Sequence, residues 1–339
     1  MVATSTQRRA SIVSIIKPIL KRLLPQHTKR RLTATLLMTL VTRPHRLRYR
    51  LNLQSIRHYK RFAQTEAHCC ICGSTGTLFF DMPDVDLCRH HGIGVFRETL
   101  SCKFCGSTNR QRTLAYALIS LLNEQSACEG DALDVLTCQG GKIEIWDTDA
   151  FDPIGVRLKS VAHITRSKYL PELPFGVELE PGVYNVDLQQ ASFPSNRFDV
   201  ILTSDVMEHV RDDDRAHMEI FRCLRPGGAY LFTVPFVEGR AQTRQLVDTR
   251  TAEDVFLEPP HYHGDPICGE ILAYRIYGRD LIERLQQAGF QARFEKLEVA
   301  TEGIFEGGYF IAMKPIARRA TAASARTRLR NGNDRSGPR

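Results

Sequence analysis

The chain has 339 residues, which is enough for one or two domains with a full hydrophobic core. Its net charge of +8 comes from the ends: residues 1–65 hold 15 Lys and Arg and no acid, and residues 314–339 hold 8 with one acid. The part between them has a net charge of −14, which makes it a poor surface for binding phosphate backbones. No run of about 18 apolar residues occurs, which argues against a transmembrane helix. The amino terminus also lacks the pattern of a signal peptide.

The first 65 residues form a basic arm with amphipathic stretches. Residues 11–24 and 32–41 place apolar side chains on one helical face between Lys and Arg. Such helices suit an anionic membrane surface, although the same charges could bind nucleic acid and the arm could also be a disordered tail. We expect a cytoplasmic protein that lies at the inner face of the membrane, with nucleic acid the less favoured partner. The polar segment 314–339 is expected to be a disordered basic tail.

Two Cys-x-x-Cys-Gly sequences indicate a zinc-ribbon-like module over residues 66–115. Ten cysteines, several of them in such pairs, favour a reduced compartment and a metal over a disulfide framework. Four thiolates from two tight turns can surround a structural Zn²⁺ in a closed tetrahedron. The expected ligands are Cys69, Cys72, Cys102 and Cys105. Cys70 could replace Cys69, and the intervening loop offers competing ligands, although a surface loop is favoured for them: Cys88, His90 and His91.

A helix is expected directly after the second cysteine pair. Thr108 or Asn109 is a suitable N-cap residue. Arg110 and Arg112 would lie in the first turn, where the helix dipole favours acids instead. Their position suggests that they pair with a carboxylate in a cleft.

Residues 131–196 offer two candidates for the first strand of a sheet, Asp134–Gly140 and Ile143–Asp149. Asp152 is a good N-cap with Pro153 at the first helical position, and that helix should end near Ser160. The next strand would then be residues 161–165. Because a parallel neighbour needs a crossover of this kind, the pattern favours residues 143–147 as the first strand.

Residues 197–236 read as a strand, a helix and a second strand. Phe198–Leu202 is a β-branched apolar run typical of a buried parallel strand, and residues 212–223 have helical spacing. Pro226-Gly227-Gly228 should end the helix, and residues 230–234 form the second strand. Ligands of such sheets bind outside the carboxyl ends of the strands. The polar residues of that edge would be Ser204, Asp205, Glu208 and His209.

The sequence FDVILTSDVMEHV followed by LRPGG resembles the fourth-strand and following motifs of class I S-adenosylmethionine-dependent methyltransferases. The resemblance covers about residues 131–310 and implies an α/β, Rossmann-like doubly wound sheet within residues 116–313. It also implies S-adenosylmethionine as cofactor. The implied contacts are Asp147 and Asp149 after the first strand, Asp187 and Leu188 after the third, and Ser204 and Asp205 after the fourth. The chain departs from the pattern because the first loop lacks glycines and Arg166–Tyr169 lacks the acid that usually binds ribose.

Residues 259–266, P-P-H-Y-H-G-D-P, are rich in turn residues and titratable groups. A helix at 281–288 and strands at 290–299 and 304–313 should follow. The loop and the C-G-S-x-x-R-x-R junction resemble a subgroup of these methyltransferases that carries a cysteine module and acts in bacterial cell-surface glycan pathways. His263 with Asp265 could serve as a general base, and His209 is its rival. A metal pair formed by His261 and His263 is less favoured.

Together these features predict methyl transfer from S-adenosylmethionine to a glycan or lipid-linked acceptor. One alternative is an RNA methyltransferase that binds RNA through the zinc module, which the acidic body disfavours. The other is a non-catalytic scaffold with a degenerate methyltransferase fold, suggested by the missing glycines and the missing ribose acid.

Overall fold

The computed structural model describes residues 64–80, 96–125, 133, 143–150, 152–159, 161, 163–265 and 269–316. The predictions for the basic arm, for Cys88, His90 and His91, for the alternative first strand at 134–140 and for nearly all of the carboxyl-terminal tail lie outside these residues. Within the described ranges, no helix combines the length and apolar character that a membrane crossing requires.

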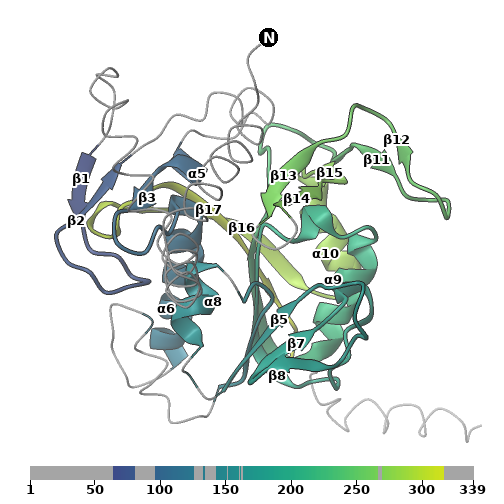
Figure 1. Cartoon of the computed structure of the whole chain (residues 1–339), viewed down its shortest axis with the longest axis horizontal. Coiled ribbons are helices and arrows are strands. Elements are labelled where there is room, and N and C mark those ends of the chain that lie inside the picture. The colour runs from purple at the N-terminus through teal and green to yellow at the C-terminus, as the bar shows by residue number, and fades with distance from the viewer. Residues whose placement is uncertain are drawn as a thin grey trace, which may run out of the picture.

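An eight-stranded mixed sheet forms the centre of the molecule (Figure 1). Its strand order is β16-β17-β9-β8-β4-β5-β7-β6. The pairs from β9 to β7 are parallel, and β17, β16 and β6 are added antiparallel at the two ends. The strands are β4 (Ile145–Asp147), β5 (Ile164–Lys168), β6 (Glu178–Glu180), β7 (Val183–Asn185), β8 (Phe198–Ser204), β9 (Leu224–Thr233), β16 (Gln291–Val299) and β17 (Ile304–Met313).

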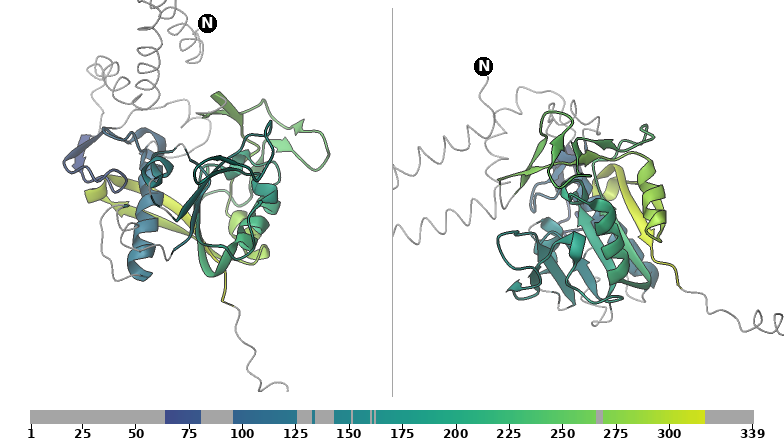
Figure 2. Two further views of the ribbon diagram at one scale, coloured as in Figure 1. Left: turned by 60° about the horizontal axis from the view of Figure 1, so that its bottom comes forward. Right: turned by 90° about the vertical axis from the view of Figure 1, so that its right-hand side faces the viewer.

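Helices cover both faces of this sheet, so alternate residues of its strands enter two different cores. On β8, Val200 and Leu202 pack with α6 (Asn109–Gln125) and α8 (Pro153–Leu158). Ile201, between them, packs on the other face with α9 (Asp213–Cys223) and α10 (Asp280–Gln287). A strand buried on both faces has to be continuously apolar, which is the pattern that identified β8 in the sequence. The further views in Figure 2 show the same layering.

Most of the expected elements are present in the sheet. β4 lies between β5 and β8, and α8 begins after Asp152, whose carboxylate accepts the Gly155 amide at 2.7 Å. The structure therefore confirms a first strand that directly precedes this helix. The helix expected at 212–223 is α9, and the last two strands are within a residue of their predicted bounds. Pro226-Gly227-Gly228 was expected to end the helix, and this prediction is wrong in one respect, because α9 already ends at Cys223. Pro226, Gly227 and Gly228 belong to β9, and Gly227 has φ +85° there.

The cysteine segment forms a small sheet of β1 (Gln64–Ala67), β2 (Thr77–Phe80) and β3 (Ser101–Cys102), with the short helix α5 (Phe96–Thr99) before β3. It lies against the turn that joins β16 to β17. His68 and Glu302 form an ion pair at 2.8 Å, and Arg112 donates to the carbonyl of Gly303. Thr108 and Gln111 form the reciprocal capping pair that begins α6, which confirms the expected helix start. The boundary expected at residue 115 falls inside α6.

Short antiparallel strand pairs build the region over the sheet edge between β9 and α10. They are β10 (Arg244–Gln245) with β15 (Arg275–Ile276), β11 (Val247–Asp248) with β12 (Val255–Phe256), and β13 (Tyr262–Asp265) with β14 (Gly269–Leu272). The segment expected to be a loop at 259–266 thus contains a strand. Its backbone pairs His263 with Ile271 and Asp265 with Gly269.

Candidate functional site

The parallel strands β4, β5, β7, β8 and β9 end at one edge of the sheet, and the polar residues of the site follow these ends. The loop after β4 holds three buried polar atoms for which the described residues provide no hydrogen-bond partner: Asp147 Oδ2, Thr148 Oγ1 and Asp152 Oδ2. Asp149 donates its backbone amide to Asp147 Oδ1 at 3.2 Å. Buried polar atoms without partners are rare in native structures, so this loop is suited to a polar ligand.

The charge of this loop suits a cationic ligand. Burial raises the pKa of Asp147 well above its usual range, and the charges of Asp152 and Asp149 raise it further. Burial and the nearby Asp149 raise the pKa of Asp152 to about 8. A positively charged group placed between these carboxylates would favour their ionised forms. The amino group and sulfonium of S-adenosylmethionine carry that charge, so the donor set fits the cofactor.

A glycine in α8 lets this helix pack closely against the loop. A Cβ atom on Gly155 would lie 2.3 Å from the Asp149 carbonyl oxygen and 2.9 Å from Asp147 Oδ2. Only a residue without a side chain lets the first turn of α8 approach the loop this closely. The sequence prediction looked for glycines before the helix and therefore missed this one inside it.

Asp187 and Leu188 follow β7, where the resemblance to methyltransferases placed the adenine contact. Asp187 caps the short 3₁₀ turn 188–190 by accepting the Gln189 amide at 2.8 Å, and Leu188 is buried. Lys168, the last residue of β5, pairs with Glu180. Residues 166–169 thus offer no acid that could bind ribose. Next to it, the exposed rings of Tyr169 and Phe175 stack with centroids 5.7 Å apart.

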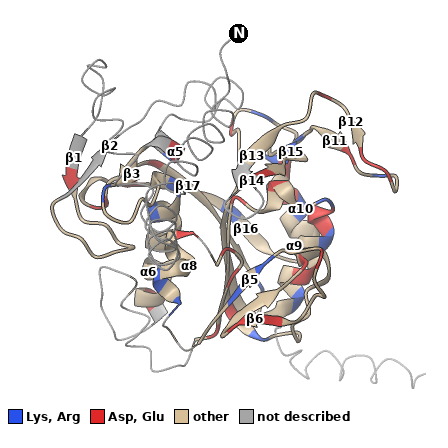
Figure 3. Ribbon diagram, viewed as in Figure 1, with Lys and Arg blue, Asp and Glu red and all other residues tan. Residues whose placement is uncertain are grey.

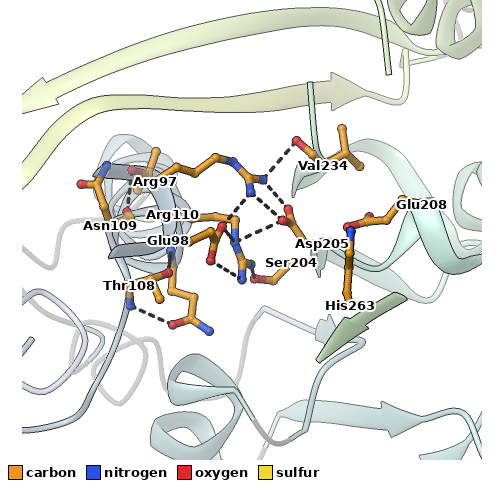
Figure 4. A network of polar contacts seen from close by, with 12 residues as sticks. Arg97, Glu98, Thr108, Asn109, Arg110, Ser204, Asp205, Glu208, Val234 and His263 are labelled. Carbon is orange, nitrogen blue, oxygen red and sulfur yellow. Dashed lines mark hydrogen bonds and ion pairs between the residues drawn. The ribbon is translucent and has the colours of Figure 1, made fainter. Parts of the chain in front are cut away.

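Asp205, directly after β8, is the centre of an ion-pair network that joins the cysteine segment to the sheet (Figure 4). Arg97 reaches Asp205 through two hydrogen bonds of 2.6 and 2.5 Å, and Arg110 lies 3.3 Å away. Glu98 accepts from both arginines, and Arg110 donates to the Ser204 hydroxyl at 2.5 Å. Burial alone would raise the pKa of Asp205, but Arg110 and Arg97 outweigh it and hold that pKa below its usual range.

This network confirms one half of the expectation for the two arginines at the start of α6. Arg110 does pair with a cleft carboxylate, whereas Arg112 is buried and donates to the carbonyls of Ser107, Leu100 and Gly303. The sequence analysis did not identify Arg97 and Glu98, because V-F-R-E-T-L matches no motif. Arg97 lies 108 positions before its main partner, so no local pattern connects the two.

Glu208, His209 and His263 form a second cluster. Figure 4 shows Glu208 and His263 beside Asp205. Glu208 is fully buried, and neither of its carboxylate oxygens has a hydrogen-bond partner among the described residues. Its Oε1 lies 3.6 Å from His209 Nε2 and 4.0 Å from His263 Nδ1. The two imidazole rings meet edge to face with centroids 4.9 Å apart. The structure thus brings together the two rival candidates for a general base and adds a carboxylate that neither prediction included.

The four predicted cysteines converge at the junction of the small sheet and α6. Their sulfur atoms all lie within 4.8 Å of one another, with Cys69 and Cys105 at 3.8 Å and Cys72 and Cys102 at 3.9 Å. Cys70 is not part of this group, because its thiol faces the carbonyl of Arg112. Four thiols in this arrangement are the donor set of a closed structural zinc site.

A cavity of about 700 Å³ borders Arg97 and Arg110 and lies between the end of β9 and the strands β16 and β17. Aromatic, acidic and basic side chains share its wall. They are Phe236, Phe294, Glu238, Glu298, Glu306, Arg97, Arg110 and Lys296. It is large enough for a sugar-sized acceptor.

Residues 133–232 match the family model described as a methyltransferase domain. Among solved structures, the chain is similar to the [4+2]-cyclase SpnF, with 18% identity over 62% of this chain and 83% of that one and a TM-score of 0.35. It is also similar to a S-adenosylmethionine-dependent methyltransferase from Methanosarcina mazei, with 19% identity, 52% and 94% coverage and a TM-score of 0.32. A third is a putative methyltransferase from Listeria monocytogenes, with 13% identity, 51% and 92% coverage and a TM-score of 0.33. No curated protein matches the chain.

Proposed function

The chain carries a class I S-adenosylmethionine-dependent methyltransferase domain, and we propose that it methylates a hydroxyl group of a glycan or lipid-linked acceptor. The cofactor supplies a methyl group on a sulfonium, which a nucleophile can displace in line. The protein has to hold donor and acceptor in that line, and such positioning contributes most of the rate. Asp147 and Asp152 would hold the charged end of the cofactor, and the adjoining residues after β7 and β8 would hold the rest.

The observation that carries the proposal is the buried cluster of Glu208, His209 and His263. A hydroxyl is a poor nucleophile until it loses its proton, so a hydroxyl acceptor needs a group that favours this loss. His209 Nδ1 donates to the Leu272 carbonyl at 2.8 Å, and this bond leaves the lone pair of Nε2 toward Glu208. The cluster therefore offers proton-accepting atoms near the carboxyl end of β8.

The walls of the cavity favour a sugar over a nucleic acid. Rings such as Phe236 and Phe294 can pack against the apolar face of a sugar, while the acids near them can accept its hydroxyl protons. Arg97, Arg110 and Lys296 line the same cavity, so the support for a sugar comes from the rings and the carboxylates and not from the net charge of the wall. On α9 and α10 acidic residues lie among the basic ones (Figure 3). An RNA acceptor would call for a basic surface instead.

We also propose that the four cysteines hold Zn²⁺ as a structural ion. A closed set of four thiolates leaves no open position for a substrate, so its contribution is to the folding of the small sheet. Anchoring of residues 1–65 on an anionic membrane remains part of this proposal and rests on their sequence alone.

Two measurements test the function. Calorimetric titration of the zinc-loaded protein with S-adenosylhomocysteine should give micromolar binding that is lost in Asp187→Ala. Asp199→Ala is the matched control, because Asp199 lies on β8 away from the carboxyl edge and pairs with Arg225. Transfer of a labelled methyl group to membrane-extracted glycolipids, and not to RNA, would support the acceptor class. Absence of cofactor binding by the folded protein, or transfer to RNA that falls steeply with salt, would overturn it.

A further inference from the structure

We propose that Glu208, His209 and His263 bind a divalent transition-metal ion at the acceptor side of the transfer site. This site is separate from the four cysteines. It deepens the proposed function and rests on it only for the role of the ion, since metal binding can be measured without any acceptor.

The donor set is the first support. Two imidazoles and one carboxylate are the three protein ligands found in catalytic zinc sites, and the same set with open positions binds Fe²⁺ and related ions. The candidate ligand atoms all lie within 4.8 Å of one another. Bond lengths of about 2.0 to 2.2 Å and tetrahedral angles would place ligand atoms about 3.3 Å apart. The observed 3.6 and 4.0 Å from Glu208 Oε1 therefore require only a small inward movement of side chains.

The state of Glu208 is the second, independent support. Its side chain is fully buried, both oxygens lack hydrogen-bond partners among the described residues, and Oε1 points at the two imidazoles. A buried carboxylate without a partner is strongly unfavourable unless a cation or a proton compensates it. A metal ion between the three groups would supply that compensation for both oxygen and nitrogen lone pairs.

The third support is the orientation of His209. Its Nδ1–H donates to the carbonyl of Leu272 on β14 at 2.8 Å, so the lone pair of Nε2 faces the carboxylate of Glu208. Two atoms that both offer lone pairs should repel each other unless an acceptor of electrons lies between them. Ligating histidines usually donate their other ring nitrogen to a carbonyl or carboxylate, which fixes the ring for binding.

Three ligands leave at least one position open for the acceptor oxygen. Bound there, the acceptor hydroxyl would lose its proton to water more readily, and the ion would replace the free imidazole as the group that favours this loss. Its oxygen would then form the bond to the methyl carbon while the carbon–sulfur bond breaks, and the electron pair of that bond stays on the departing S-adenosylhomocysteine. The ion is not oxidised or reduced in this step.

The test is metal content of the full chain, reconstituted with Co²⁺ and freed of loosely bound metal. The wild type should hold two ions, one of which shows thiolate charge-transfer absorption. Glu208→Gln and His263→Ala should each lose the ion without that absorption, with affinity reduced at least about 100-fold. His261→Ala is the matched control, because His261 precedes the same strand and faces Glu258 at 3.9 Å. It should keep both ions.

Retention of a single, thiolate-bound ion by the folded wild type would overturn the proposal, as would two ions in Glu208→Gln. Thermal melts with and without added Co²⁺ show whether the variants fold, and a shift in the wild type that Glu208→Gln lacks would support the site. The two proposals fail separately: cofactor binding without a second ion refutes only the metal site. A second ion without methyl transfer to a hydroxyl refutes only the proposed reaction.

Discussion

Replacing Asp205 by Asn should destabilise the protein markedly, because Asp205 compensates two buried arginines at once. The side chains of Arg97, Arg110 and Asp205 are 17%, 12% and 15% exposed. Asn keeps the size of Asp and tolerates the left-handed backbone at this position, where φ is +52°. The change therefore removes the charge and little else. Loss of one partner from a buried ion pair typically costs about 3 to 5 kcal/mol.

Glu98 and the Val234 carbonyl still accept hydrogen bonds from the two arginines, so we expect the low end of that range, about 3 kcal/mol. For a domain of this size, this corresponds to a decrease in Tm of about 6 to 12 °C. Urea unfolding at pH 7 with zinc present measures the free energy directly. The matched control is Asp248→Asn, which breaks an exposed pair with Arg250 and should leave the transition where it is.

The pH dependence gives an internal check. The folded-state pKa of Asp205 is depressed, so its contribution is present above the unfolded value of about 3.9 and is lost as the pH falls through the folded value. The difference between wild type and Asp205→Asn should thus shrink below about pH 4. A loss smaller than about 1 kcal/mol at pH 7 would refute the argument that the network joins the cysteine segment to the sheet.

Three further predictions concern the cofactor loop and the cysteines. Gly155→Ala should weaken S-adenosylhomocysteine binding at least about tenfold in calorimetry, because the new methyl group would displace the Asp149 carbonyl. Gly239→Ala is the control: its new methyl group would enter open space, so this variant should not reduce stability. Binding of S-adenosylhomocysteine should strengthen by up to about 50-fold as the pH rises from 6 to 8. The reason is that the ligand's ammonium group favours the ionised form of Asp152, whose pKa is about 8. Asp152→Asn should remove most of this pH dependence. Removal of metal by a chelator, or Cys102→Ser, should lower both the Tm and the cofactor affinity, and unchanged affinity in metal-free protein would contradict this coupling.

The sheet could be predicted from the sequence because its strands carry their own signals. Residues 200–202 are apolar without interruption and follow Phe198 and Asp199, which indicates a strand buried on both faces, and this is where β8 lies between two helical layers. The start of α8 was equally readable, since an N-cap followed by Pro defines the start of a helix. The strand expected next at 161–165 is β5 at Ile164–Lys168. Such signals are local, and they place a strand without stating which side chains will meet at its end.

The candidate site depends on contacts that no local pattern contains. Glu208 was expected at the cleft edge and His263 in the segment above it, but their approach is set by where the hairpin β13–β14 packs. The glycine that packs against the loop lies inside α8, next to the Asp149 carbonyl, and it belongs to no loop motif. Sequence reasoning therefore located the edge of the site correctly and left its pairings open.

The position of the two arginines explains why a cysteine module that does no chemistry can still belong to a transfer site. Arg97 and Glu98 lie just before the second cysteine pair, and Arg110 lies just after it, at the start of α6. Both arginines bind Asp205, the residue that follows β8 and directs the chain toward Glu208. A structural ion bound by Cys102 and Cys105 would fix both segments that carry these arginines, the one before the cysteine pair and the one after it. The module then acts as a positioning element for the carboxyl end of β8, which is why its loss should be felt in cofactor binding as well as in stability.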